Sequence, residues 1–330
     1  MNQVSILVAT CGRPTALRDM LNSLCDVRVP DTVTAELILV ENGAPSGVES
    51  LLAALPEHPF TIKYLYEPVA GKSRALNRAF KHATGDIFLF TDDDVRFPKD
   101  WLVEMCKPLL SGEGSVVVGG SRLAPRLLRP WMTRQHRSLL ASTEYLCDDD
   151  PSEFAGVNMA CRREVFGLVP HWDCELGGGG LGNSEDSLLA YQFKEAGYAF
   201  VSRTTVHLEH HPAESRLVYG AWLRAASSYG RSIAYYTHHW RHETLHFVRL
   251  RLLYFLLKLH LRLLVHRRQT ADSEGIPPWE LSYRIDIAKL QRFLHERRRP
   301  RNYAMRGLVK LRGLRAESDQ PESPVVAPGR

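Results

Sequence analysis

The stretch Asp86–Trp101, D-I-F-L-F-T-D-D-D-V-R-F-P-K-D-W, decides the fold expected for this chain. Ile87–Phe90 is a short, continuous run of apolar β-formers, which is typical of a strand buried on both faces of a parallel sheet. It leads directly into three consecutive aspartates, and Trp101 then opens a segment with the pattern of a helix. The stretch predicts a central strand that ends in a cluster of carboxylates.

Three neighbouring carboxylates repel one another, so a folded chain keeps them only with compensation. A divalent cation such as Mn²⁺ or Mg²⁺ supplies it, because these ions bind carboxylate oxygens and in turn hold phosphate oxygens. In an extended segment Asp92 and Asp94 point to one side and Asp93 to the other. We therefore expect Asp92 and Asp94 to bind the metal. The alternative is a solvated acidic turn that caps the next helix.

The composition is that of an ordinary soluble protein: 330 residues, 44% of them hydrophobic and 24% charged. Such a chain can bury a large core and form one large domain or two. It contains no apolar run of 18 residues, so no transmembrane helix is expected, and the N-terminus lacks the basic region of a signal peptide. The six cysteines are scattered, without a C-x-x-C pair, which favours a reducing cytoplasm.

The charge is unevenly distributed along the chain. Residues 216–330 contain 22 Lys and Arg against 9 Asp and Glu, whereas residues 1–215 contain 20 against 28. A basic C-terminal third on an acidic body indicates that this third meets an anionic surface.

Strands and helices alternate through the first half of the chain, which predicts an α/β fold whose sheet has helices on both faces. In such sheets ligands bind beyond the carboxyl ends of the strands. Thr10, Glu41, Glu67 and Asp92–Asp94 are all expected at such ends, so we expect them to line one crevice. The predicted strands are Val4–Thr10, Leu37–Val40 and Ile62–Tyr66, and the helices that follow them are Thr15–Leu24, Val48–Leu55 and Gly71–Ala83.

The second half is less regular. Val116–Gly119, Glu153–Cys161 and Tyr198–Leu208 are predicted strands, and Ser184–Gly197 is a predicted helix. Trp172–Gly182 is a glycine-rich loop. It formally matches G-x-G-x-x-G, but no strand precedes it, so we interpret it as a mobile lid or acceptor wall and not as a dinucleotide site.

The C-terminal third is predicted to be helical. Leu245–His266 is rich in leucine and carries several cations, which exclude a bilayer span but suit a helix at a membrane surface. A domain helix with one buried face is an equal alternative. The expected organisation is a catalytic domain at 1–215, a basic helical extension at 216–300 and a basic disordered tail at 301–330, with helices also at Leu217–Tyr236 and Leu281–Arg297.

Three polar motifs have both a functional and a structural interpretation. Lys72 follows Gly71 at a helix start, which indicates an anion site or an ordinary solvated helix end. Asp186 and its neighbour Glu185 open another helix, so Asp186 is a general base or the pair complements the helix dipole. His210 and His211 are surface residues, or one of them is a third metal ligand beside Asp94.

Taken in order, these segments resemble the family 2 glycosyltransferases, the large group of inverting enzymes with the GT-A fold. The resemblance covers roughly residues 4–230. It depends on V-S-I-L-V-A-T-C-G-R-P, the strand into E-N-G, A-G-K-S-R-A-L-N-R-A, F-T-D-D-D-V-R-F-P-K-D-W-L, G-V-N-M-A-C-R-R-E-V-F and G-N-S-E-D-S-L-L-A-Y-Q-F-K-E-A-G-Y.

The resemblance implies a nucleoside-diphosphate sugar in the crevice and a mixed, mainly parallel GT-A sheet. It places Thr10, Arg13 and Glu41 around the nucleoside, with Lys72 and Asn77 nearby. Asp92 and Asp93 would also meet the donor, Asp92 and Asp94 would hold Mn²⁺ or Mg²⁺, and Asp186 would be the base beside Glu185. The second strand ends in E-N-G where many relatives have D-D, which leaves UDP and GDP open as the nucleotide.

The expected reaction is metal-dependent transfer of a sugar, with inversion, to a hydroxyl of a glycan or lipid-linked saccharide. This would be a step of polysaccharide biosynthesis at the cell envelope, and we expect the enzyme in the cytoplasm or on the inner face of the plasma membrane. One alternative is a sugar nucleotidyltransferase. Another is a non-catalytic protein that binds nucleic acid or a membrane, although no nucleic-acid motif is present and we expect no nucleic-acid partner.

Overall fold

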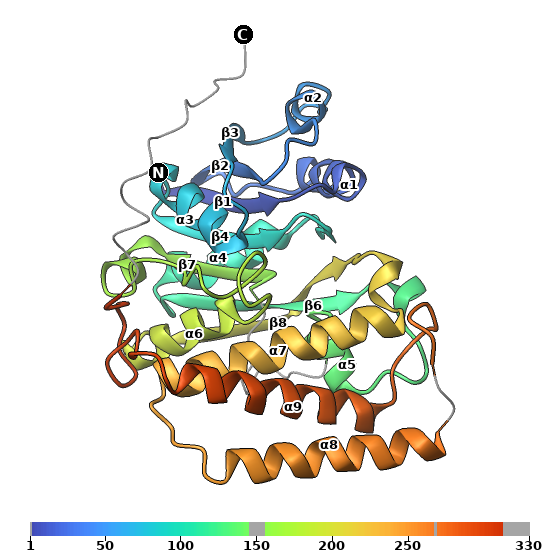
Figure 1. Ribbon diagram of the computed structural model, residues 1–330. Coiled ribbons are helices and arrows are strands. Elements are labelled where there is room, and N and C mark those ends of the chain that lie inside the picture. The colour runs from blue at the N-terminus through green and yellow to red at the C-terminus, as the bar shows by residue number, and fades with distance from the viewer. Residues whose placement is uncertain (1, 145–155, 267–268, 313–330) are drawn as a thin grey trace.

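A computed structural model describes residues 2–144, 156–266 and 269–312. Its centre is an eight-stranded sheet in the order β3-β2-β1-β4-β7-β6-β8-β5, with helices on both sides (Figure 1). The predicted mixed, mainly parallel sheet is therefore confirmed. The strands are β1 (Asn2–Thr10), β2 (Val33–Asn42), β3 (Thr61–Glu67), β4 (Ile87–Asp92), β5 (Val95–Arg96), β6 (Val116–Leu123), β7 (Asn158–Arg162) and β8 (Phe200–His210).

The first four strands are parallel and share the edge at which each of them ends. Alternate residues of β1 enter different cores: Ile6 packs with α1 (Pro14–Cys25) and α4 (Trp101–Ser111), whereas Leu7 packs with α3 (Lys72–His82) and α6 (Glu185–Glu195). Because both faces of the sheet are buried, these strands are continuous apolar runs in the sequence. A short helix, α2 (Val48–Ala53), lies between β2 and β3.

The chain turns sharply after β4 and enters β5, which pairs antiparallel with the end of β8. Val95 is the register partner of His210, and the backbone N–H of His211 donates to the Asp94 carbonyl at 2.7 Å. This pairing brings the turn at residues 93–94 to a histidine more than a hundred residues later in the chain.

In the second half, β6 and β7 complete the sheet. The predicted strand Glu153–Cys161 is present from Asn158, and residues 153–155 lie outside the described part of the chain. The buried Asn158 side chain donates to the carbonyls of Gly120 and Val206 and accepts from the Trp101 indole, so it connects β6, β8 and α4. Short 3₁₀ helices are η1 (Pro125–Leu127), η2 (Arg163–Gly167) and η3 (Glu214–Arg216).

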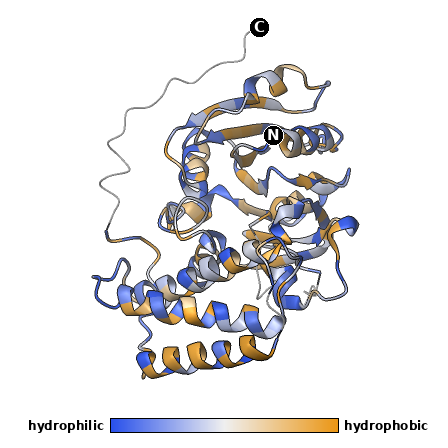
Figure 2. Cartoon of the chain, turned by 45° about the vertical axis from the view of Figure 1, so that its right-hand side comes forward, coloured by the Kyte–Doolittle hydropathy of each residue, from blue (hydrophilic) through white to orange (hydrophobic). Residues whose placement is uncertain are grey.

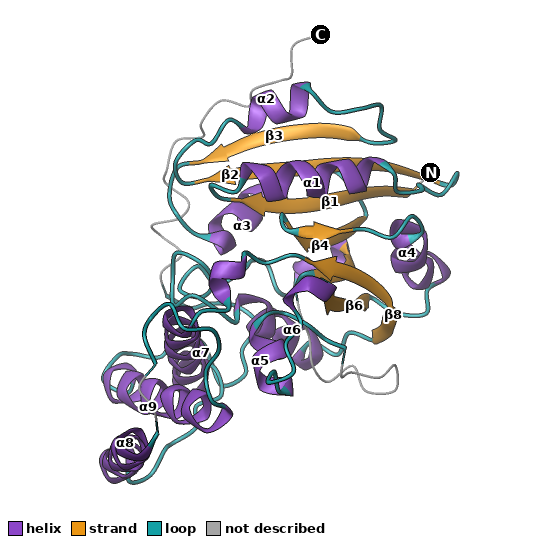
Figure 3. Ribbon diagram, turned by 90° about the vertical axis from the view of Figure 1, so that its right-hand side faces the viewer, coloured by secondary structure: helices purple, strands orange, loops and turns teal. Residues whose placement is uncertain are grey.

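The C-terminal third is helical, as predicted. The helices α7 (Tyr219–His239), α9 (Pro278–Glu296) and α8 (Val248–Val265) are stacked in that order away from the sheet (Figure 3). Trp222 of α7 packs with Leu123 and Leu127 after β6, and beside them lies α5 (Arg134–Leu139), which the sequence did not predict. The helices therefore share a hydrophobic cluster with the sheet region.

The glycine-rich loop is fixed by many contacts. Lys72 N donates to the Gly178 carbonyl at 2.8 Å, and a Cβ on Gly179, whose φ is +85°, would lie 2.7 Å from the Gly71 Cα. Only a residue without a side chain permits this approach. The expectation of a mobile lid is thus replaced by a packed wall.

The expected disordered tail needs a correction for its first residues. Tyr303 and Lys310 are buried, and both bind the Asp173 carboxylate of the glycine-rich loop, at 2.7 and 2.6 Å. Residues 301–312 therefore pack on the molecule, because their polar groups have buried partners that composition alone does not reveal. Residues 313–330 lie outside the described part of the chain.

Candidate functional site

Asp92, Asp94 and His210 form a cluster at the carboxyl end of β4. One potential ligand atom from each of them lies within 4.8 Å of the other two. The last residue of β4 is Asp92, the turn that follows supplies Asp94, and the last residue of β8 supplies the imidazole. Two carboxylates and one imidazole gathered in this way form a candidate site for a divalent cation.

The orientation of His210 is set by its second nitrogen. Its Nδ1 lies 2.8 Å from the Leu140 carbonyl, an acceptor, so Nδ1 carries a proton. Its Nε2 then faces Asp94 Oδ1 at 3.2 Å. In this position Nε2 either donates a proton to Asp94 or, without that proton, offers a lone pair to a metal ion.

Asp93 faces away from this cluster. Its carboxylate is fully buried, accepts a hydrogen bond from Thr10 Oγ1 at 2.6 Å and pairs with Arg13. Burial raises the pKa of Asp93 to about 6, although Arg13 opposes this effect. Asp93 therefore fastens the turn to the end of β1, and the predicted alternation of the three aspartates is what the structure shows.

Asp94 presents its two oxygens to different partners. Arg13 Nη1 donates to Oδ2 at 2.5 Å, and Oδ1 faces His210. Burial alone would raise the pKa of Asp94, but the hydrogen bond with His210 and the charges of Arg13 and Arg216 outweigh it and lower the pKa. Asp94 thus remains an anion, as a metal ligand must be.

Lys72 lies between the candidate metal site of Asp92, Asp94 and His210 and the start of α6. Its Nζ is 2.6 Å from Asp92 Oδ1 and 3.5 Å from Glu185 Oε1. Burial acts to lower the pKa of Lys72, but the charges of Asp92 and Glu185 outweigh it and raise the pKa. The ammonium therefore stays charged at the N-terminus of α3, where an anion would also be favoured.

Glu185 and Asp186 differ in their surroundings. Burial and the charge of Asp186 raise the pKa of Glu185 despite the nearby Lys72. Asp186 instead accepts two backbone hydrogen bonds, from Gly156 to Oδ2 and from Ser187 to Oδ1, both 2.7 Å long. These bonds fix the direction of the Asp186 carboxylate.

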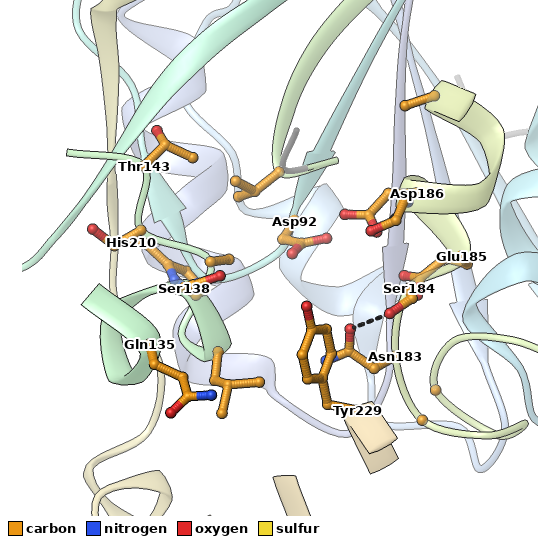
Figure 4. Close-up of a pocket in the computed structure, with 18 of the residues that line it drawn as sticks. Asp92, Gln135, Ser138, Thr143, Asn183, Ser184, Glu185, Asp186, His210 and Tyr229 are labelled. Carbon is orange, nitrogen blue, oxygen red and sulfur yellow. Dashed lines mark hydrogen bonds between the residues drawn. The ribbon is translucent and has the colours of Figure 1, made fainter. Parts of the chain in front are cut away.

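A cavity of about 750 Å³ is lined by Lys72, Asp92, Glu185, Asp186 and His210, whereas Asp93 and Asp94 are not part of its lining. In Figure 4, Asp92 lies between Asp186 on one side and His210 and Ser138 on the other, and Tyr229 of α7 lies below them in this view. Other charged residues of its lining are Arg134, Lys194 and Arg216. The cavity therefore has cations, carboxylates and hydroxyls around one space.

Several predicted residues lie outside this cavity. The Glu41 carboxylate is buried and accepts hydrogen bonds from the backbone N–H and hydroxyl of Ser46 and from the hydroxyl of Tyr64. Glu41 therefore stabilises the loop after β2. Asn77 binds the backbone N–H and carbonyl of Trp172 and so anchors the glycine-rich loop. Of the strand-end residues expected to share one crevice, Asp92 lines the cavity, whereas Glu41 and Glu67 are engaged by their own loops. Any contact of Thr10, Arg13, Glu41 or Asn77 with a nucleoside remains a prediction.

The choice between the two histidines is decided by geometry. His211 pairs with Glu209 at 2.8 Å, whereas His210 joins the aspartates. The candidate metal site therefore includes His210 and not His211, and metal binding by His210 stays a prediction. The two are adjacent in a strand that ends here, so they point in opposite directions.

Some cavity residues had no visible signal in the sequence. Arg216 precedes α7, and Thr133, Gln135 and Ser138 belong to the segment around α5. None of these lies in a strand-end motif. The basic composition after residue 215 was the only available indication for Arg216, because its position depends on how α7 packs.

The fold and this edge of the sheet define a class of protein, the GT-A-type transferases. The family model of glycosyl transferase family 2 matches residues 5–168, and the chain belongs to this family. It is therefore an enzyme, a glycosyltransferase that uses nucleotide sugars. The curated proteins contain no match to the chain.

Solved structures give the same fold. A mannosyltransferase from Pyrobaculum calidifontis, solved with GDP-Man and Mn²⁺, is 20% identical, with a TM-score of 0.53 over 89% of this chain and 70% of that one. TarS 1-349 of S. aureus, solved with UDP-GlcNAc, is 16% identical, with a TM-score of 0.47 over 70% of this chain and 65% of that one. At this identity the likeness to the mannosyltransferase supports the fold.

Proposed function

We propose that this glycosyltransferase transfers a sugar from a nucleoside-diphosphate sugar to an acceptor hydroxyl, with inversion at the anomeric carbon. The observation that carries the proposal is that Asp186 lines the same cavity as Asp92 and His210, two members of the cluster of Asp92, Asp94 and His210. One side of the cavity suits a metal-bound diphosphate, and the other suits a general base that faces the acceptor.

The donor set fits a divalent metal. Carboxylates suit Mg²⁺ and Mn²⁺ alike, whereas the imidazole of His210 favours Mn²⁺. A bound cation would supply charge neutralisation for the diphosphate as it leaves. The complex of the P. calidifontis mannosyltransferase with GDP-Man and Mn²⁺ agrees with this choice.

The chain's own groups have separate tasks in the proposed step. Asp186 removes the proton of the acceptor hydroxyl, the oxygen forms a bond to the anomeric carbon, and the bond from that carbon to the diphosphate breaks. Lys72 and Arg216, both cations in the cavity lining, hold the negative charge of the diphosphate. The acceptor enters beside Ser138, Gln135 and Tyr229, whose polar groups suit a saccharide. We propose a glycan or lipid-linked saccharide in this role, as in polysaccharide assembly at the cell envelope.

Family membership sets aside the sugar nucleotidyltransferase and the non-catalytic protein that the sequence left open. The two also predict different products. A nucleotidyltransferase would release pyrophosphate, whereas the proposed reaction releases a nucleoside diphosphate.

The test is donor binding and slow donor hydrolysis across UDP-, GDP- and dTDP-sugars, with Mn²⁺, with Mg²⁺ and with EDTA. We expect one donor to bind in a metal-dependent way, with Mn²⁺ more effective than Mg²⁺. His210→Gln should weaken Mn²⁺-dependent binding at least about tenfold, because a ligand is lost. His211→Gln is the matched control and should bind like the parent protein. Equal losses in both variants, or binding that EDTA leaves unchanged, would overturn the metal assignment.

A further inference from the structure

The helix α8 has two apolar faces on opposite sides. Val248 and Leu259 are buried, and together with the half-buried Leu252 and Phe255 they face the packed helices, where Val248 clusters with Leu290 and Phe293 of α9. A helix held by one face normally turns polar residues to the other side. In α8 the second face is apolar as well.

The outer face consists of large exposed side chains. Leu250, Leu253, Leu257, Leu261 and Leu264 are between 53% and 65% exposed. They recur every three or four residues, so at about 100° per residue they fall within one sector opposite the buried face. Val265, which is 84% exposed, continues this face at the end of the helix. Figure 2 shows α8 at the lower edge of the molecule, coloured mostly as hydrophobic.

Cations border this leucine face on both sides. Helical spacing places Arg249 along one border and Arg251, Lys258 and Arg262 along the other. The helix contains no Asp or Glu. Lys258 lies over the ring of Tyr283 and Arg262 over the ring of Trp279, both of α9. These contacts keep the two charges beside the interface between α8 and α9.

We propose that the leucine face of α8 docks on an anionic membrane surface. The leucines would enter the boundary of the acyl chains, and the bordering cations would meet the phosphates of the lipid headgroups. No helix in the described part of the chain is long and apolar enough to cross a membrane. The helix would lie parallel to the surface, as expected of a helix whose exposed side is apolar, with basic borders and no acidic residue.

Charge favours a lipid surface over a second copy of this chain. Two leucine faces brought together would place two sets of bordering arginines and lysines side by side, without any carboxylate on α8 to neutralise them. An anionic lipid surface neutralises both borders at once. The proposal is independent of the transferase reaction, because α8 contributes no residue to the lining of the cavity.

The test is co-sedimentation of the full chain with vesicles of phosphatidylcholine alone and with 30% phosphatidylglycerol. We expect binding to the anionic vesicles that weakens as salt rises. Leu257→Glu with Leu261→Glu should reduce the bound fraction about tenfold or more, because charges replace the apolar contact. Arg249→Gln with Arg251→Gln should weaken binding to anionic vesicles and lower its dependence on salt.

The matched controls are Leu168→Glu, an equally exposed leucine on another part of the surface, and Lys107→Gln, an exposed cation of α4. Both should bind vesicles like the parent chain, and all variants should keep the parent's circular dichroism and donor binding. Equal binding by the Leu257/Leu261 variant would overturn the proposal. So would a dimer in sedimentation velocity that this variant dissociates, combined with no binding to anionic vesicles at low salt.

Discussion

Three adjacent carboxylates of one turn have three different environments. Asp92 pairs with Lys72, Asp93 is buried with Thr10 and Arg13, and Asp94 lies between Arg13 and His210. The alternation of side chains at the end of an extended strand produces this division. One aspartate can therefore fasten the turn while its two neighbours remain available for a cation.

Asp186→Asn should separate donor binding from transfer. The substitution keeps the shape of the side chain but removes the proposed base, so we expect donor affinity to change little and kcat to fall by about 10²- to 10⁴-fold. Binding by calorimetry and steady-state rates with an identified acceptor provide the two measurements.

Glu185→Gln is the matched variant at the neighbouring position. Glu185 lies 3.5 Å from Lys72, so its loss should change donor affinity more than the chemical step. If Glu185→Gln lost transfer while Asp186→Asn kept it, the roles of these two residues would have to be exchanged.

At the scale of elements, α7 and α9 are joined by a buried ionic cluster. Glu296 is fully buried and binds His239 Nε2 and Arg299 Nη1, each at 2.9 Å, and also Arg292. Burial alone would raise the pKa of Glu296, but the hydrogen bond with His239 and the two arginines outweigh it and lower the pKa to about 2. The charged form of Glu296 therefore stabilises the contact between the two helices.

This cluster predicts a specific loss of stability in acid. An unfolded glutamate has a pKa of 4.5, so the contribution of Glu296 is complete above that pH and is lost as pH falls toward about 2. The depression corresponds to about 3 kcal/mol of unfolding free energy. Urea unfolding between pH 3 and 7 should show a shallower decline for Glu296→Gln than for the parent chain. That variant should also be less stable at pH 7, by up to about 3 kcal/mol, because Arg292, Arg299 and His239 lose an anionic partner.

Glu243→Gln provides the control, since Glu243 is half-exposed and forms only a surface pair with Arg241. Its pH profile should follow that of the parent chain. Parallel profiles for the parent and Glu296→Gln would show that the helix contact does not depend on this charge.

The elements that the sequence predicted well are those whose pattern is local. Ile87–Phe90, Thr15–Leu24 and Gly71–Ala83 each have the period of the element they form, and the structure differs from the prediction by a few residues at the ends. Features that depend on contacts between distant residues were missed. The short helix α5 has no sustained apolar period, and the order of β7, β6 and β8 follows from packing and not from any single segment.

The candidate site shows the same limit. The aspartates and the Glu185–Asp186 pair were visible because they lie at element ends. The choice of His210 over His211 required the pairing of β5 with β8, and the structural use of Glu41 and Asn77 required knowledge of the loops that they hold. Residue type predicted the chemistry, whereas tertiary contacts decided which polar side chains are free to perform it.

At the scale of the whole molecule, the last described residues fasten the wall of the cavity. Lys310 Nζ lies 2.6 Å from Asp173 and 3.1 Å from Glu175, and Asn302 Nδ2 donates to Glu175 at 2.7 Å. Asp173 and Glu175 belong to the glycine-rich loop, whose later residues Gly178 and Gly182 line the cavity. The loop is thus held in place from the C-terminal side.

Lys310→Met should loosen this loop. It removes the cation that pairs with a buried carboxylate, which costs about 3–5 kcal/mol of stability. We expect faster amide exchange at Leu176–Gly182 and a lower transfer rate, measured by hydrogen exchange and steady-state kinetics. Arg306→Gln is the control, because Arg306 is exposed and pairs with Glu195 at the surface. Unchanged exchange in Lys310→Met would show that the loop holds its shape without this contact.

The contact between Lys310 and Asp173 also affects the order in which parts of the protein fold during synthesis. Asp173 leaves the ribosome long before Lys310, which follows it by 137 residues. At a synthesis rate of about 5–20 residues per second, Lys310 is added roughly 7–30 seconds after Asp173. During that interval the sheet and the aspartate turn can form, but the wall of the cavity has no cation to hold it. The glycine-rich wall of the cavity therefore gains this contact only after Lys310 has emerged.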